Sequence, residues 1–73
     1  MDQELSNQLT EIARCHAEER GWTWRGEVKI TDESFKGEAV WAVHSNAMMR
    51  GINARILIRK SDLAIVHSGY MPR

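Results

Sequence analysis

The feature that most constrains this fold is a change in hydrophobic period directly after Gly21. Before it, one stripe recurs every three or four positions, as on one face of an α-helix, and consists of Leu5, Leu9, Ile12, Ala13 and His16. After it, apolar and polar residues alternate from Trp22 and Trp24 onward, which is the period of a half-buried β-strand. The chain therefore changes once from a helical to a strand pattern.

The helix is expected to run from about Gln3 to Arg20. Asp2 is a suitable N-cap, and Glu4 places negative charge in the first turn, where the helix dipole favours it. Gly21 follows the last turn, as is usual at a helix C-terminus.

Four strands are predicted to follow as a β-meander. The first covers about 22–31 and the second about 39–45, with a turn at 32–37 between them. The third covers about 52–59, after a loop at 46–51, and the fourth covers about 63–68, before a tail that ends the sheet. The predicted fold class is α+β: one N-terminal helix packed on a four-stranded antiparallel meander, with residues 1–73 forming one domain.

One helix can cover only one face of such a sheet. The alternation places the apolar side chains of the first and third strands beneath the helix, and the other face carries Leu57 with Arg25, Lys29, Arg55 and Arg59. This second face is expected to be solvated or used in binding.

Composition narrows the class of protein. Cys15 is the only cysteine, so no disulfide can form within the chain, and a lone thiol fits a reducing cytoplasm. The acidic, polar N-terminus does not read as a signal peptide, and the apolar runs are too short to span a membrane. We therefore expect a cytoplasmic protein. A net charge of zero does not match a dedicated nucleic-acid binder.

The sequence contains no pattern typical of a metal site, a catalytic nucleophile or a phosphate-binding loop. His16, His44 and His67 lack the spacings of metal ligands, so no metal site and no cofactor are expected. Cys15 and His16 are adjacent on the predicted helix and point about 100° apart, which prevents a thiol–imidazole pair. The glycines do not form a phosphate-binding loop. An enzyme is not expected.

The strand pattern AVWAV followed by ARILIRKSDLAIV resembles small helix-plus-meander domains of the PepSY and cystatin-like kind. Trp41, Ala42 and Val43 occupy the place of the aromatic-x-Val strand, and Ser61 and Asp62 that of the hairpin turn. Leu63 stands where the turn of that family usually has glycine. Size and layout are also similar to some bacterial immunity proteins, and this likeness implies an inhibitory or binding role without any catalytic residue.

The function predicted from these patterns is that of a small protein-binding module, of the inhibitor or immunity-protein kind. Its contacts are expected to come from the second sheet face and the loop after the second strand, namely Met48, Met49, Arg50, Arg55, Leu57 and Arg59. The alternative is a domain for single-stranded nucleic acid that uses Arg25, Lys29, Arg55 and Arg59. The partner could equally be a second copy of the chain, since a core this small gains from dimerisation.

Overall fold

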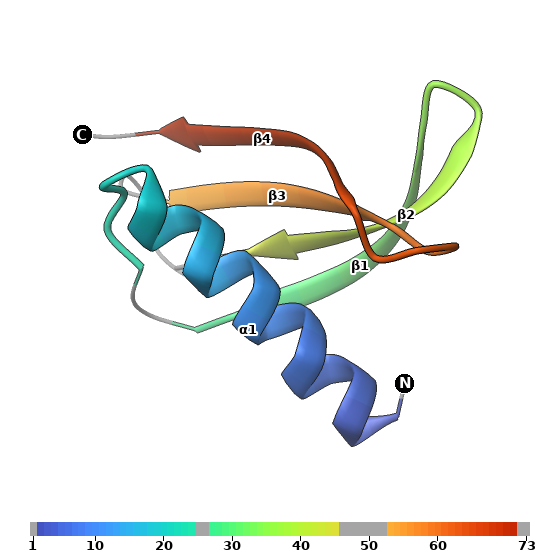
Figure 1. The fold of residues 1–73 in the computed structure, drawn as a ribbon, viewed down its shortest axis with the longest axis horizontal. Helices are drawn as coiled ribbons and strands as arrows, with labels where there is room; N and C mark the ends of the chain where they lie inside the picture. Colours follow the sequence, from blue (N-terminus) through green and yellow to red (C-terminus); the bar gives the residue numbers. More distant parts are fainter. Residues whose placement is uncertain (1, 25–26, 46–52, 72–73) are drawn as a thin grey trace.

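The computed structural model describes residues 2–24, 27–45 and 53–71. In chain order it contains α1 (Gln3–Glu19), β1 (Lys29–Phe35), β2 (Glu38–His44), β3 (Asn53–Arg59) and β4 (Ile65–Met71). The strands form one sheet in the order β1-β2-β3-β4, and each pairs antiparallel with its neighbour. The predicted α+β fold is confirmed, and Figure 1 shows α1 crossing one face of the sheet.

The helix begins and ends where its capping residues predict. The Asp2 carboxylate accepts a hydrogen bond from the Glu4 N–H at 3.2 Å, which satisfies one of the free donors of the first turn. Arg20 is the C-cap, and Gly21 follows with a φ of 73°, a left-handed conformation that glycine adopts at little cost.

The main hydrophobic core lies between α1 and the central strands. Leu9, Ala13 and Ala17 form the fully buried stripe of the helix. They belong to one cluster with Val43 of β2 and with Ile56 and Ile58 of β3. The two alanines let the helix pack against the sheet side chains, because each contributes only a methyl group to the space between the layers. Trp22, Trp24 and Trp41 pack around the cluster as partly buried neighbours.

The first strand differs from the prediction at both ends. Trp22 and Trp24 precede β1 instead of beginning it: the Trp22 N–H donates to the Ala17 carbonyl at 2.8 Å, which ties this residue to the end of the helix. The segment predicted as a turn at 32–37 is strand as far as Phe35. The connection is a two-residue hairpin at Lys36 and Gly37, whose φ values of 50° and 81° are those that a type I′ turn requires.

The fourth strand is shifted and longer than predicted. It begins at Ile65 and continues through Gly69 and Tyr70, which had been assigned to the tail. The Tyr70 ring explains the extension, because it stacks on Trp22 with ring centroids 5.3 Å apart and accepts a hydrogen bond from the Thr23 N–H. A register shift near Leu57 and Ile58 leaves Val66 as the extra residue of a β-bulge.

The sheet face opposite α1, here called the open face, carries a second hydrophobic cluster. Val40, Ala42 and Leu57 are at most 1% exposed, and Phe35 and Val66 pack against them. The Phe35 ring stacks on His67 of β4 with centroids 5.2 Å apart, although β2 and β3 separate these strands in the sheet order. In Figure 1 the β1–β2 hairpin rises from the other end of β1 toward the height at which β4 is drawn. Strong sheet twist therefore covers one end of the face that the sequence predicted to be free.

Candidate protein-binding surface

The structure places three of the predicted contact residues on the open face, where they differ in how far they are exposed to solvent. Arg55, Leu57 and Arg59 of β3 alternate with Ile56 and Ile58, which point into the main core. Leu57 is only 1% exposed, because Phe35 and Val66 pack against it, so its side chain offers little surface to a partner here. Met48, Met49 and Arg50, and also Arg25, lie outside the described residues.

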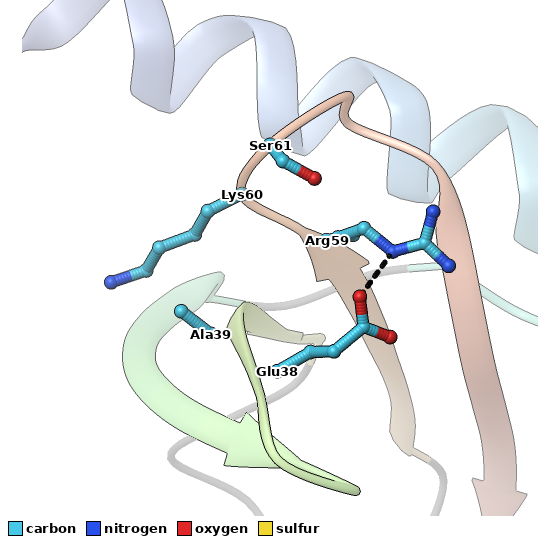
Figure 2. Close-up of a pocket in the computed structure, with 5 residues that line it drawn as sticks. All are labelled: Glu38, Ala39, Arg59, Lys60 and Ser61. Carbon is cyan, nitrogen blue, oxygen red and sulfur yellow. Dashed lines mark ion pairs between the residues drawn. The ribbon is translucent and has the colours of Figure 1, made fainter.

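Arg59 is held within the chain. Its Nε lies 3.1 Å from Glu38 Oε2, its Nη1 lies 3.0 Å from Asp62 Oδ2, and its side chain is 33% exposed. It lines a surface pocket of about 380 Å³ together with Glu38, Ala39, Lys60 and Ser61. Figure 2 shows the guanidinium facing Glu38 while the Lys60 side chain points away from both.

This pocket has no spare positive charge for an anionic ligand. Glu38 and Asp62 both pair with Arg59. The Lys60 Nζ lies 2.6 Å from Asp32 Oδ1 and 4.1 Å from the centre of the Trp41 ring. The pairing is structural, since it ties the β3–β4 turn to the edge of the sheet at β1 and to the start of β2.

The other end of the open face presents two cationic side chains and a histidine in register across three strands. Lys29 of β1 lies opposite His44 of β2, and His44 lies opposite Arg55 of β3. The row, here called the cross-strand row, ends at Gly69 of β4, which has no side chain. Lys29 and Arg55 are exposed, with 44% of the Arg55 side chain open to solvent. Cross-strand neighbours on one face stand about 5 Å apart, so a partner would meet these groups together.

Glu33 fixes the position of Arg55 within this row. Its carboxylate forms an ion pair with the Arg55 guanidinium and accepts a hydrogen bond from the Thr31 hydroxyl at 3.0 Å. The Thr31 hydrogen bond, followed by the charge of Arg55, holds the pKa of Glu33 below its ordinary value and outweighs the effect of burial. Glu33 therefore stays ionised at neutral pH, and Arg55 is oriented before any partner arrives.

His44 is neutral at physiological pH in this setting. Burial lowers its pKa most, the positive charge of Arg55 lowers it further, and Glu33 opposes both. Its Nε2 lies 3.5 Å from the Thr31 hydroxyl and 3.9 Å from Glu33 Oε2. Both groups approach the same ring nitrogen, whereas a catalytic relay needs the nucleophile on one nitrogen and the orienting carboxylate on the other. The geometry fits an interaction surface better than a nucleophilic site.

Sequence reasoning missed Thr31, Glu33, His44 and the Phe35–His67 pair. The cause was the assignment of 32–37 to a turn, which removed Glu33 and Phe35 from the sheet. A signal was present: Lys29, Thr31, Glu33 and Phe35 continue the period of two as far as Lys36 and Gly37. A lysine before the glycine is less typical of a type I′ turn than asparagine or aspartate, and this hid the hairpin.

Comparisons with known proteins do not indicate a function for this surface. A scan against protein-family models, a search of curated proteins and a search of solved structures each give no significant match. Within residues 2–24, 27–45 and 53–71, no helix has the length and apolar character needed to cross a membrane. In the same ranges, no three His, Cys, Asp or Glu side chains are grouped as a metal ion would require.

Proposed function

We propose that this chain is a small protein-binding module, of the inhibitor or immunity-protein kind, that contacts its partner through the cross-strand row. The observation that carries the proposal is the exposed Arg55 guanidinium, which Glu33 holds beside His44 in the row that begins at Lys29. Arginine is enriched in protein interfaces, and a side chain that is already oriented loses little entropy on binding.

The balance of charge favours a protein partner over nucleic acid. Lys29, Arg55 and Arg59 are the cations of the open face among the described residues, and Arg55 and Arg59 already pair with the carboxylates Glu33, Glu38 and Asp62. Binding of single-stranded nucleic acid needs unpaired cations along the backbone path and flat rings on which bases stack. The Phe35 and His67 rings instead stack on each other over the second cluster.

The loop residues predicted from the sequence remain part of the proposal. Met48, Met49 and Arg50 belong to the segment that follows β2 in the chain and precedes β3. Methionine side chains adapt to irregular apolar surfaces, so these residues would add apolar contact to the charged contacts of Arg55. No catalytic step is assigned to the module.

The proposal is tested by comparing two charge-matched variants against proteins captured from a native lysate. Arg55→Glu reverses the charge at one position of the cross-strand row, whereas Arg20→Glu makes the same change at the exposed helix end. We expect the captured partner to bind wild type and Arg20→Glu alike, and to bind Arg55→Glu at least about tenfold more weakly, a loss of about 1.4 kcal/mol. Circular dichroism confirms that both variants fold.

Equal affinity of Arg55→Glu and Arg20→Glu would rule out the cross-strand row as the contact. The nucleic-acid alternative is measured separately, with single-stranded DNA and RNA oligonucleotides at low and high salt. Binding that falls steeply with salt and is lost in Lys29→Glu would replace the proposed function with that alternative.

A further inference from the structure

His44 lies among the charged side chains of the open face. On β1, Lys29 lies opposite it in register, and the Oε2 atom of Glu33 lies 3.9 Å from His44 Nε2. On β3, Arg55 lies opposite it, and the Arg55 guanidinium pairs with the same Glu33 carboxylate. Within the described part of the chain, these three are the charged groups that act on the ring. A proton gained or lost by His44 therefore changes the charge of the cross-strand row at its centre.

The Thr31 hydroxyl determines which nitrogen of the neutral ring carries the proton. Its Oγ1 lies 3.0 Å from Glu33 Oε2 and 3.5 Å from His44 Nε2. A hydroxyl has one proton to donate, and an ionised carboxylate can only accept, so this proton goes to Glu33. Toward the ring, Thr31 Oγ1 is then an acceptor, and His44 Nε2 must carry the N–H that donates to it.

The Glu33 carboxylate favours the same arrangement on separate grounds. An Nε2–H directs its positive end at the carboxylate oxygen 3.9 Å away, whereas an unprotonated Nε2 would turn its lone pair toward that negative oxygen. A neutral imidazole has a single N–H, so Nδ1 carries the remaining lone pair. The His44 ring makes no other hydrogen bond or ion pair with the described residues. Nδ1 is therefore the atom that accepts a second proton.

We propose that this arrangement makes the cross-strand row a pH-sensitive contact surface. The neutral ring keeps its proton on Nε2, and acidification adds a second proton, taken from solvent, at Nδ1. The row then carries positive charge on Lys29, His44 and Arg55 instead of on two of them. The Arg55–Glu33 ion pair persists, because the new proton is on the ring nitrogen that does not face Glu33.

The change in charge falls in a narrow range of pH. Burial lowers the pKa of His44 most and Arg55 lowers it further, while Glu33 raises it and Lys29 adds to the lowering. The ring is therefore neutral at about pH 7.5 and gains its charge below the ordinary histidine value of about 6.5. Lysine and arginine side chains keep their charge over this range, and the lowered pKa of Glu33 keeps its carboxylate ionised.

The consequence for binding rests on the proposed function, whereas the position of the protons does not. A partner that meets the row with carboxylates finds one more cation there at low pH, so its affinity should rise on acidification. The partner chemistry that fits the row is accordingly an acidic protein segment. The two parts of the inference are tested separately.

The positions of the protons are measured by NMR on the full chain, because the nitrogen shifts of an imidazole distinguish its two neutral tautomers and its cation. We expect the Nε2–H form at about pH 7.5 and protonation of Nδ1 on acidification to about pH 5.5. Thr31→Ser keeps the hydroxyl and should resemble wild type. Thr31→Val has nearly the same shape without the acceptor, and should raise the share of the Nδ1–H form. The guanidinium resonances of Arg55 should stay those of a paired side chain throughout.

The effect on binding is measured with an acetylated hexa-aspartate peptide, whose carboxylates stay ionised at both pH values. At constant ionic strength, wild type should bind this peptide about threefold or more tightly at about pH 5.5 than at about pH 7.5. His44→Gln is the matched control, since glutamine keeps a donor within reach of Thr31 but takes up no proton. Its affinity should change less between the two pH values.

Two results would overturn the position of the protons: a wild-type ring that is Nδ1–H at neutral pH, or an Arg55–Glu33 pair that separates when His44 becomes charged. Equal pH responses of wild type and His44→Gln, including no binding by either, would overturn the pH-sensitive contact. A failure of the proposed function has a different signature. In that case Arg55→Glu and Arg20→Glu bind the captured partner alike, while the NMR results for His44 are unchanged.

Discussion

At the scale of single residues, two residues with a side chain adopt the left-handed backbone conformation, which a Cβ atom disfavours. Lys36 has a φ of 50° in the β1–β2 turn, and Leu63 has a φ of 59° before β4. The left-handed region costs a residue with a Cβ roughly 1–2 kcal/mol, and asparagine and glycine enter it most readily. Leu63 is partly buried against the main core and donates its N–H to the Arg59 carbonyl at 2.8 Å, so packing offsets its strain. Lys36 is exposed and has no such burial.

Lys36→Asn should therefore stabilise the protein. Asn-Gly is a preferred pair for a type I′ turn, and the gain in the free energy of unfolding should be about 1 kcal/mol. Urea unfolding of wild type, Lys36→Asn and Lys36→Gln measures it. The glutamine variant removes the same charge above the Phe35 ring without relieving the turn, and should gain nothing. An equal gain in both variants would attribute the effect to charge instead of backbone conformation.

Two histidines should make stability depend on pH. Burial, and then the charge of Arg20, lowers the pKa of His16, whose Nε2 lies 3.0 Å from the Ser68 hydroxyl. Burial, and then Arg55, lowers the pKa of His44. When folding lowers the pKa of a histidine, the unfolded state becomes protonated at a higher pH than the folded state does. Acidification then favours the unfolded state. The contribution of each histidine is therefore fully present above the unfolded value of about 6.5 and is lost as the pH falls below it.

The free energy of unfolding should fall as the pH decreases from about 7.5 to 5.5. The double variant His16→Gln, His44→Gln cannot titrate at these positions and should show a flatter profile over the same range. Glu33 acts in the same direction in a separate window, below its unfolded value of about 4.3, because its folded pKa is lowered as well. A wild-type protein that becomes more stable on acidification to pH 5.5 would contradict the assignment.

At the scale of elements, the sheet is buried on both faces over part of its length. Ile56 and Ile58 face α1, while Leu57 between them faces Phe35 and Val66. Continuous burial along β3 is usual for a strand covered on both sides by other elements. Here the second cover is the curled β1–β2 hairpin, since the chain has no other helix among the described residues.

Leu57→Ala should destabilise the domain by about 2–4 kcal/mol, because it leaves a cavity in the second cluster. Leu57→Met keeps the volume and should lose less than about 1.5 kcal/mol. Thermal and urea unfolding measure both. If Leu57→Ala unfolded like wild type but lost partner binding, Leu57 would be the exposed anchor that the sequence predicted, and the second cluster would not contribute to folding.

At the scale of the whole molecule, the two clusters share the same two strands. Val43 belongs to the main core and Ala42 to the second cluster, and the residues of β3 alternate between them. Neither cluster can lose its packing without displacing backbone that the other needs. The described part of the chain is therefore expected to unfold as one cooperative unit.

This coupling predicts one transition for variants of either cluster. Leu9→Ala on the helix side and Leu57→Ala on the open face should each lower the free energy of unfolding by about 2–4 kcal/mol. Each variant should still unfold in a single transition, with a lower midpoint than wild type. Tryptophan fluorescence reports on the helix side, where Trp22, Trp24 and Trp41 pack, and far-ultraviolet circular dichroism reports on the whole fold. Transitions that separate between the two probes in Leu57→Ala would show that the second cluster unfolds on its own.

The local sequence pattern predicts the elements and the faces on which their side chains lie. The periods of 3.6 and 2 depend only on neighbouring residues, so they predicted the helix to within one residue, four strands after it and the opposite sides of Leu57 and Ile56. Strand ends were predicted less well, because the Lys36–Gly37 turn and the Trp22–Tyr70 stack override local preference.

Whether the second face is free depends on contacts between strands that form only in the folded chain. Alternation says which way a side chain points, but twist across all four strands is what brings Phe35 of β1 onto His67 of β4 and buries Leu57. Likewise, the sequence shows that Arg55 and Arg59 share a face, whereas their carboxylate partners come from other strands and turns. Contacts between distant residues depend on sheet twist and strand register, which no local pattern contains.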